Sequence, residues 1–498
     1  MTGFSGEEFD VLVIGGGITG CGVARDAAMR GLRVALAEQD DFASGTSGRS
    51  SRLIHGGIRY LEQGQLHLVR ESIRERQTLL RIAPHLVKPL AFTWPLYRGA
   101  RIGKLKLSVA LLIYQLMAGS RSRRHAALNA AETLDREPRL KSDGLVGGAV
   151  YYDACTDDSR LTLVNAVAAQ NNGGTVRNHT RVTEIIRHQG KAIGAVAASR
   201  FSGEAEEIRA RVIVNATGVW QNDFSAEERI KRHRASKGVH VAVPRERVGN
   251  QEALTLISPV DGRVMFCLPA ATHTIIGTTD TWTDESPETV HAWSSEVEYL
   301  IRSTNAYFPA ARLTAADVVS AWAGIRPLAN ATSANPTVVS REHSIVTDSS
   351  GVIKVTGGKL TTYRSMAAEI VDLVQKALGR PKTPAPTDLV DLPGADRSTE
   401  IAVLQRETPD LSKPLVEGLP YTGAHLVHGV RKEMAQTLSD LLIRRTHLAF
   451  ETSDHGRSIA PAAADIVAPL LGWDDHTKRA RVRELNKDVE RIFTIGKR

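Results

Sequence analysis

The hydrophobic positions near the start of the chain predict a strand, a tight turn, a helix and a second strand. Residues 11–14 are all apolar, as expected for a parallel strand that is buried on both faces. Small residues recur in the next segment up to Gly31, which favours a helix packed closely on that strand. Residues 32–36 are again largely apolar and return as a second strand. This order is typical of a βαβ unit in a Rossmann-like α/β domain.

The turn of this unit carries the pattern G-x-G-x-x-G at Gly15, Gly17 and Gly20. The first glycine permits the turn, the second lets the backbone approach a pyrophosphate, and the third lets the helix pack on the strand. The free N–H groups of the helix N-terminus then face the phosphates. Glu38 ends the second strand, where a carboxylate accepts hydrogen bonds from both ribose hydroxyls. We therefore expect FAD or NAD rather than NADP, and the pattern alone leaves the choice between the first two open.

A long loop follows this unit. Residues 40–60 are rich in glycine and serine and poor in apolar residues. Long loops beside a cofactor-binding unit are more often functional than simple flexible surface loops. Ser47 and Ser51 are therefore candidates to line the path of the phosphates.

A later strand completes the nucleotide domain. Residues 212–218 form an apolar run that enters an Ala-Thr-Gly turn ending at Thr217 and Gly218. Such a strand is common in two-domain flavoproteins and usually has no counterpart in NAD dehydrogenases. Val182 lies in a strand segment where a Rossmann-type domain holds the adenine.

The patterning changes in the second half of the chain. Apolar and polar residues alternate through 235–345, for example at 239–243, which predicts a mixed or antiparallel sheet laid over the cofactor. The segment 390–498 is mostly helical in pattern, and 427–450 is its clearest helix, carrying Arg444 and Arg445.

One interval concentrates positive charge. Between Glu75 and Glu132 there is no acidic residue and there are ten Lys or Arg, whereas the whole chain has a formal net charge of +8. Inside this interval, residues 103–119 place five apolar side chains on one helical face: Leu105, Val109, Leu112, Ile113 and Leu116. Basic residues flank the segment on both sides, at Arg98, Arg101, Lys104 and Lys106 and at Arg121, Arg123 and Arg124.

The apolar face edged by cations predicts insertion into the interface of an anionic membrane, because the segment is too short to span one. A core helix with a solvated basic flank is the alternative. Nucleic acid is disfavoured, since no aromatic platform or recognition motif accompanies the charge.

Composition limits the remaining possibilities. A chain of 498 residues should form two or three domains. Its cysteines, Cys21, Cys155 and Cys267, are far apart and form no CxxC pair, so neither a metal site nor a disulfide framework is expected. The N-terminal segment has no secretory pattern, which favours a cytoplasmic protein, soluble or peripheral on the inner face of the plasma membrane.

Seven motifs resemble one family. GGGITG, SRLIHGGIRYLE, NATG, KGVHVAV, IIGTTD, GIRPL and GGKLTTYR occur in the order and approximate spacing of FAD-dependent glycerol-3-phosphate dehydrogenases. The resemblance runs from Phe9 to Ala377 and continues more weakly beyond. Related amine and amino-acid oxidases share the first motif and the fold, but not HGG-x-RYLE or GGKLTTYR.

The resemblance implies an α/β fold of three parts: a Rossmann-like FAD-binding domain, a mixed or antiparallel-sheet substrate (cap) domain and a C-terminal helical domain. The expected boundaries are 1–75, 150–234 and 346–380 for the FAD-binding domain, 76–149 for a membrane-associating insertion, 235–345 for the cap domain and 390–498 for the helical domain.

The implied reaction is oxidation of sn-glycerol 3-phosphate to dihydroxyacetone phosphate, with hydride transfer from C2 to flavin N5 and electrons passed to membrane quinone. By motif position, the catalytic residues would be His240, Arg326 and Lys359. Substrate contacts would come from Arg59, Tyr60, Thr278 and Arg341. Further cofactor contacts would come from His55, Gly358, Lys359, Leu360 and Thr361.

Elementary chemistry agrees with these roles. A phosphomonoester carries about two negative charges at neutral pH, and guanidinium groups bind phosphate oxygens bidentately. His240 is a candidate general base, since an ordinary histidine pKa of ~6.5 suits proton uptake near neutrality. Lys359 and Arg326 would stabilise the developing alkoxide and the reduced flavin.

Two positions depart from the family pattern, and other functions stay open. Arg52 stands where members carry lysine, and Ala270 stands where some carry tryptophan, which predicts a more open pocket wall. A soluble oxidase that releases hydrogen peroxide, a flavin oxidase of another substrate and a flavin-bearing membrane module without turnover are the alternatives. The sequence leaves open whether the chain forms a homodimer.

Overall fold

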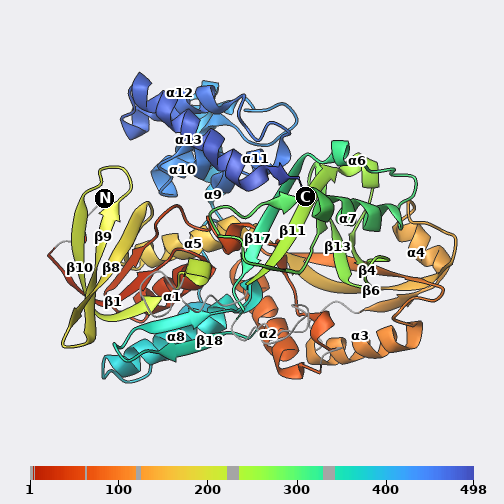
Figure 1. Ribbon diagram of the computed structural model, residues 1–498, viewed down its shortest axis with the longest axis horizontal. Coiled ribbons are helices and arrows are strands. Elements are labelled where there is room, and N and C mark those ends of the chain that lie inside the picture. The colour runs from red at the N-terminus through yellow and green to blue at the C-terminus, as the bar shows by residue number, and fades with distance from the viewer. Residues whose placement is uncertain are drawn as a thin grey trace.

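The structure, a computed structural model, describes residues 4, 6–61, 64–118, 125–220, 235–328 and 342–497, with the backbone alone at 59 and 61. Two large sheets lie side by side, and a helical domain covers one edge of both (Figure 1). The basic residues Arg121, Arg123 and Arg124 and the predicted substrate ligand Arg341 lie outside the described residues.

The first sheet contains the predicted nucleotide-binding unit. Its strands are β1 Glu8–Ile14, β2 Val34–Ala37, β7 Thr175–Arg177, β8 Thr180–His188, β9 Lys191–Ser199, β10 Ala205–Asn215, β18 Ser344–Thr347 and β19 Ile353–Thr356. Strands β19, β10, β1, β2 and β7 are parallel in that order, and β18 and the β8–β9 hairpin add antiparallel pairs.

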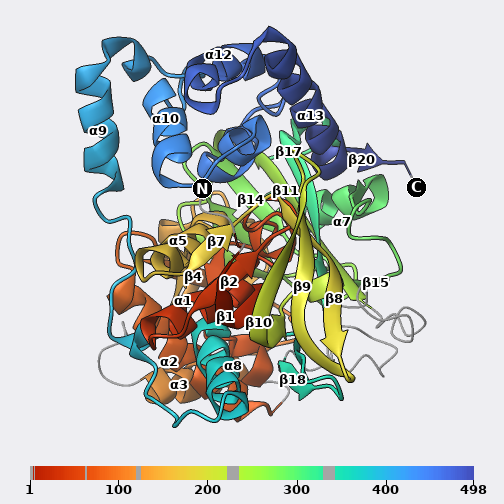
Figure 2. The ribbon, with the colours of Figure 1, turned by 90° about the vertical axis from the view of Figure 1, so that its left-hand side faces the viewer.

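Strand β1 is buried on both faces, as its apolar run predicts. Val11 and Val13 pack towards a core that includes the helices α1 Ile18–Met29, α5 Asp158–Asn171 and α8 Tyr363–Ala377. Leu12 and Ile14 pack in a second core on the side of the β8–β9 hairpin. Figure 2 shows these helices and the hairpin around the sheet.

The helix α1 lies very close to β1. A Cβ atom added at Gly20 would lie 1.9 Å from the carbonyl oxygen of Gly15, so only glycine permits this approach. Gly20 thus has the packing role that the motif predicts.

The second sheet carries the cap. Its strands are β3 Leu53–Ile54, β4 Lys88–Tyr97, β5 Ala126–Leu128, β6 Leu145–Cys155, β11 Ala235–Pro244, β12 Ala253–Ile257, β13 Val264–Pro269, β14 His273–Gly277, β15 Thr281–Thr283 and β17 Ser320–Arg326. Its pairs are mainly antiparallel, as the alternating pattern predicts. The helices α4 Ala130–Arg136, α6 Arg245–Val248 and α7 Ser294–Asn305 lie around it.

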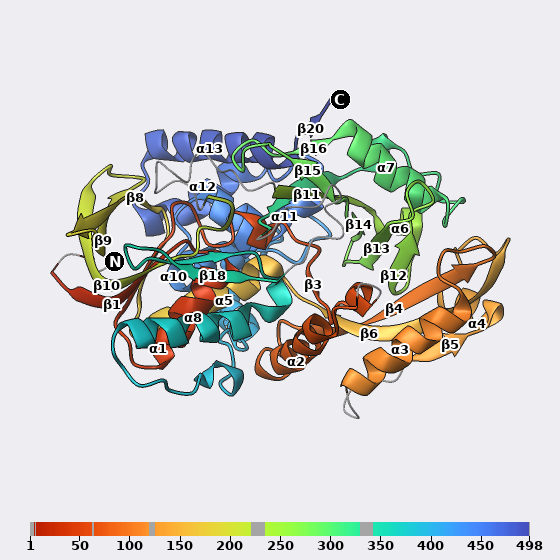
Figure 3. The same cartoon turned by 60° about the horizontal axis from the view of Figure 1, so that its bottom comes forward.

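The segment 76–149 is not a unit of its own, contrary to the sequence-based boundary. Strand β4 pairs with β6 and also with β12, through Phe92 opposite Ala253. Strand β4 therefore belongs to the cap sheet. The helices α2 Leu66–Ile82 and α3 Lys104–Ala118 lie on one side of this sheet (Figure 3), and Leu107 and Leu111 of α3 pack in its core.

The C-terminal segment is helical, as expected, but its clearest predicted helix is interrupted. The helices are α9 Arg397–Glu407, α10 Gly423–Lys432, α11 Leu448–Glu451, α12 Ala460–Leu471 and α13 Asp475–Phe493. A continuous helix over 427–450 was wrong, because α10 ends at Lys432 and a π-helical turn follows at Asp440–Arg445. Asp440 accepts hydrogen bonds from the backbone of Gln436 and Thr437, which starts this separate turn.

Candidate flavin and substrate site

One large cavity of about 590 Å³ lies between the two sheets. The turn after β1 and the end of β2 line one part, and strands of the cap sheet line another. The cavity therefore joins a dinucleotide-type turn to a pocket whose walls come from a different sheet.

The dinucleotide end is built from the predicted glycine turn. Gly15 has φ +106°, and an added Cβ would lie 2.8 Å from the carbonyl oxygen of Ala216. Glu38 accepts hydrogen bonds from the backbone N–H groups of Gly16 and Asp40. Burial raises the pKa of Glu38 to about 7, so a ligand hydroxyl that donates to this carboxylate would favour its charged form.

Most predicted cofactor residues meet at this cavity. Those that line it are Gly15, Gly17, Glu38, Ser47, Ser51, His55, Val182, Thr217, Gly218, Gly358, Lys359, Leu360 and Thr361. The open glycine turn and the carboxylate at the end of β2 fit a dinucleotide. Their individual contacts to FAD stay predictions.

His240 lies on β11 at the substrate side of the cavity. Its Nε2 is 2.8 Å from the Ser51 hydroxyl oxygen, and its ring stacks on Trp322 at a centroid distance of 5.4 Å. Burial, with repulsion from Arg326 and Arg52, lowers the pKa of His240 to about 3. The imidazole of the free protein is therefore neutral at physiological pH.

Arg326 is fixed beside this histidine by polar partners. Its guanidinium donates to Thr278 Oγ1 at 2.8 Å and to the Asp280 carboxylate at 3.3 Å. A Cβ added at Gly238 would lie 2.1 Å from Arg326 Nη2, so the guanidinium packs directly on the backbone of β11. We call His240, Ser51, Thr278, Arg326 and Lys359 the cavity cluster.

Lys359 and Tyr60 form another wall. The Lys359 Nζ lies 3.9 Å from the centroid of the Tyr60 ring, a cation–π contact. The backbone of Arg59 belongs to the same short helix as Tyr60, but its side chain and Arg341 lie outside the described residues. The predicted substrate contacts of Arg59 and Arg341 thus stay predictions.

Several lining residues were not predicted. Phe92 and Trp94 of β4, Tyr151 of β6 and Lys106 and Leu107 of α3 extend the cavity towards α3. The alternation of β4 carries a signal for the first two, whereas the approach of α3 depends on the tertiary fold.

The two departures from the family pattern lie outside the cavity lining. The Arg52 guanidinium lies over the rings of Phe450 and Trp322, at 4.9 and 5.7 Å. Ala270 packs against the hydrophobic core, and the described lining of the cavity does not include it. The more open wall expected at Ala270 stays a prediction.

The fold and the cavity define a two-sheet, dinucleotide-binding oxidoreductase. The family described as FAD dependent oxidoreductase matches residues 10–364, and the C-terminal domain of alpha-glycerophosphate oxidase matches residues 394–478. The chain therefore belongs to the FAD-dependent oxidoreductases, and its cofactor is FAD.

Near full-length relatives place it more narrowly, among the glycerol-3-phosphate dehydrogenases. It is 38% identical to the glycerol-3-phosphate dehydrogenase of Mycobacterium leprae, over 98% of this chain and 89% of the relative. The aerobic glycerol-3-phosphate dehydrogenase of Bacillus subtilis is 33% identical, over 98% of this chain and 96% of the relative.

A solved structure has the same fold over nearly the whole chain. The glycerol-3-phosphate dehydrogenase of Bacillus halodurans complexed with FAD has a TM-score of 0.79 and 30% identity, over 98% of this chain and 96% of that chain. The resemblance derived from the seven motifs is confirmed.

Proposed function

We propose that this chain oxidises sn-glycerol 3-phosphate to dihydroxyacetone phosphate and passes the electrons to a membrane quinone at the inner face of the plasma membrane. Bound FAD supplies the acceptor for the hydride that leaves substrate C2. The observation that carries the proposal is the single cavity in which a dinucleotide turn meets a neutral histidine and a fixed guanidinium.

The cavity cluster suits a small phosphorylated alcohol. Arg326 presents a positive charge at a fixed position, because Thr278 and Asp280 hold its guanidinium. Lys359 adds a second cation in the same cavity. A substrate dianion of about two charges would be bound by such groups, and the same charges would stabilise an alkoxide that forms at the hydroxyl.

His240 would take the proton of the substrate hydroxyl. It is neutral in the free protein because its charged form is disfavoured by burial and by Arg326 and Arg52. A bound dianion nearby would offset that repulsion and raise the affinity of His240 for a proton. Substrate binding would thus prepare the base that the reaction needs.

Helix α3 supports the proposed membrane contact. Its inner residues Leu107 and Leu111 are buried, whereas Leu105 and Leu116 on the predicted apolar face are 79% and 73% exposed. The four basic residues near its start are also exposed: Arg98, Arg101, Lys104 and Lys106. Within the described residues, none of the helices combines the length and apolarity needed to span a bilayer. An exposed apolar face beside cations fits the interface of an anionic bilayer.

The half-reaction is tested by anaerobic reduction of the bound flavin. Glycerol 3-phosphate should bleach the visible flavin band, whereas glycerol and amino acids should not. Arg326→Met should raise the substrate concentration needed for half-maximal bleaching, while His476→Gln, a control on the exposed surface of α13 and outside the cavity lining, should leave it unchanged. Absence of bleaching in a flavin-loaded protein would refute the proposed substrate.

The membrane contact is tested with vesicles of anionic phospholipid. The double variant Leu105→Asp/Leu116→Asp should lose binding in a sedimentation assay and still reduce its flavin with glycerol 3-phosphate. Leu389→Asp is a matched control, because Leu389 is also 73% exposed but lies outside α3. Equal binding of all three proteins would contradict the membrane role of α3.

The acceptor is tested separately. Peroxide formed per substrate in air, measured with and without a soluble quinone, distinguishes the quinone reaction from an oxidase. Low peroxide together with rapid quinone reduction is expected.

A further inference from the structure

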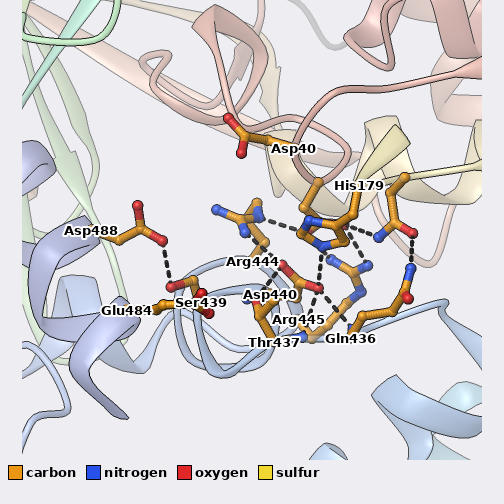
Figure 4. A network of polar contacts seen from close by, with 12 residues as sticks. Asp40, His179, Gln436, Thr437, Ser439, Asp440, Arg444, Arg445, Glu484 and Asp488 are labelled. Carbon is orange, nitrogen blue, oxygen red and sulfur yellow. Dashed lines mark hydrogen bonds and ion pairs between the residues drawn. The ribbon is translucent and has the colours of Figure 1, made fainter. Parts of the chain in front are cut away.

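A buried polar cluster joins the FAD-binding domain to the C-terminal domain. Asp41 and His179 come from the first, and Asp440, Arg444 and Arg445 come from the second. We call these five residues the interdomain cluster, and all five side chains are buried. Figure 4 shows His179, Asp440, Arg444 and Arg445 pointing towards one another.

Asp41 is the centre of the contacts between the domains. Arg445 donates to both of its carboxylate oxygens, at 2.7 and 2.9 Å. Arg444 donates through Nε at 2.5 Å to Asp41 and through Nη2 at 2.8 Å to Asp440. The π-helical turn places these two consecutive arginines on one carboxylate, and π-turns often occur at functional positions.

His179 completes the cluster. Its Nε2 lies 2.9 Å from the Asp440 carboxylate. Burial acts to lower the pKa of His179, but Asp440 outweighs this effect and raises the pKa. Burial likewise acts to raise the pKa of Asp41, and Arg445 and Arg444 hold it below the ordinary value. The charged form of each group is therefore favoured by a partner from the other domain.

A metal ion is a weaker explanation of the cluster. Asp41, His179 and Asp440 have ligand atoms within 4.8 Å of one another. However, both carboxylates already accept hydrogen bonds from guanidinium groups, whose positive charges disfavour a cation at the same place.

The segment that carries Asp41 also forms the end of the cavity where Glu38 is predicted to bind the ribose. One residue earlier, the Asp40 N–H donates to Glu38 Oε1 at 2.9 Å. Two residues later, the Ala43 N–H donates to the Gly16 carbonyl at 3.1 Å. Phe42 packs directly on Gly16, since a Cβ added there would lie 2.8 Å from its ring.

This segment needs support from outside. Ala43 has φ +62°, a left-handed conformation that costs energy for a residue with a side chain. Asp41 is a charge without solvent contact, which is stable only when it is paired. Without Arg444 and Arg445, both features would favour a different path for residues 38–43.

We propose that the C-terminal domain secures FAD: Arg444 and Arg445 hold Asp41, and thereby keep Glu38 and the glycine turn in the geometry that binds the adenosine half of the cofactor. The two arginines are positioning residues that touch neither substrate nor flavin. The affinity for FAD thus depends on a domain whose two arginines act on the cofactor site only through Asp41.

The test compares two variants of the full chain that each remove a cation between the C-terminal domain and the FAD-binding domain. Arg445→Met removes the bidentate contact to Asp41. Arg481→Met removes the cation–π contact between α13 and Phe201 and leaves the contacts of Asp41 in place. After the flavin is removed, FAD and ADP are titrated into each protein, and the change in protein fluorescence gives the Kd.

Arg445→Met is expected to weaken FAD and ADP binding by about tenfold or more, as for removal of one partner of a buried charge pair. Both ligands should weaken by the same factor, because the defect lies at the adenosine half. Arg481→Met should leave both Kd values within about twofold, because Arg481 shares no partner with Arg445.

Two results would overturn the proposal. One is an unchanged Kd in Arg445→Met, and the other is an equal loss of affinity in both variants, which would indicate general weakening of the interface. If Arg445→Met does not fold, Arg445→Lys is measured by the same criteria, because it keeps the charge and loses the bidentate geometry. If both variants fold, Arg445→Lys should retain part of the affinity for FAD that Arg445→Met loses. Since the readout is FAD binding, the result does not depend on the substrate proposed above.

Discussion

The cavity cluster and the interdomain cluster use similar residues in opposite ways. Each contains a buried histidine near arginine. His240 has cations nearby, and burial together with Arg326 and Arg52 lowers its pKa to about 3. His179 contacts the Asp440 carboxylate at 2.9 Å, which outweighs burial and raises its pKa.

The difference lies in what completes each cluster. At the domain interface, every charge has an opposite charge from the protein itself. In the cavity, cations outnumber the carboxylates that face them, so an anion can supply the missing charge. A cluster that the protein completes stabilises the fold, and one that it leaves incomplete can bind and respond to a substrate.

The largest effect is expected from removing the neutral base. His240→Gln should slow anaerobic flavin reduction by about 10²–10⁴-fold, the usual range for loss of a general base. The visible spectrum of the bound flavin should stay unchanged, because His240 is predicted to act on substrate. A wild-type reduction rate would show that another group takes the proton.

A second variant makes the cavity cluster resemble the interdomain cluster. Ser51→Asp would place a carboxylate beside His240 Nε2, where the serine hydroxyl now lies at 2.8 Å. The new charge would raise the pKa of His240 from about 3 towards its ordinary value, so that protonation extends to mildly acidic pH. Flavin reduction should slow by about 10–10²-fold at mildly acidic pH and recover as the pH rises through the raised pKa.

Ser51→Asn is the matched control for that variant, since it has a similar size and no charge. It should show no such recovery with rising pH. If both variants have the same pH profile, the protonation state of His240 does not control the rate.

The fold around the first glycine turn could be predicted because the signal is local. The apolar run of β1, the glycine spacing and Glu38 all lie within one βαβ unit, and each has a steric or hydrogen-bonding reason at its own position. Distant motif residues such as His240 and Arg326 carry no local sign of their proximity. Their proximity in the folded chain was expected only from the resemblance to a family.

The interdomain cluster had no comparable signal. Asp41, His179 and Asp440 belong to no motif, and their pairing depends on how the C-terminal domain docks. The same docking explains why the helix expected over 427–450 is interrupted: Arg444 and Arg445 reach Asp41 from a π-helical turn. The cap sheet similarly includes β4 and β6 because long-range pairing with β12, rather than local pattern, decides where they lie.

The smallest effect is expected from the pH dependence of stability at the domain interface. Because the folded state raises the pKa of His179, the folded protein binds its proton more tightly than the unfolded chain does. This stabilisation is complete below the unfolded pKa of about 6.5 and is lost as the pH rises through the folded pKa. The urea midpoint of the wild type should therefore fall over that range relative to His179→Gln, which lacks the titrating group. The difference between the two midpoints isolates His179 from all other titrating groups, and a difference that stays constant with pH would mean that the proton on His179 does not stabilise the interface.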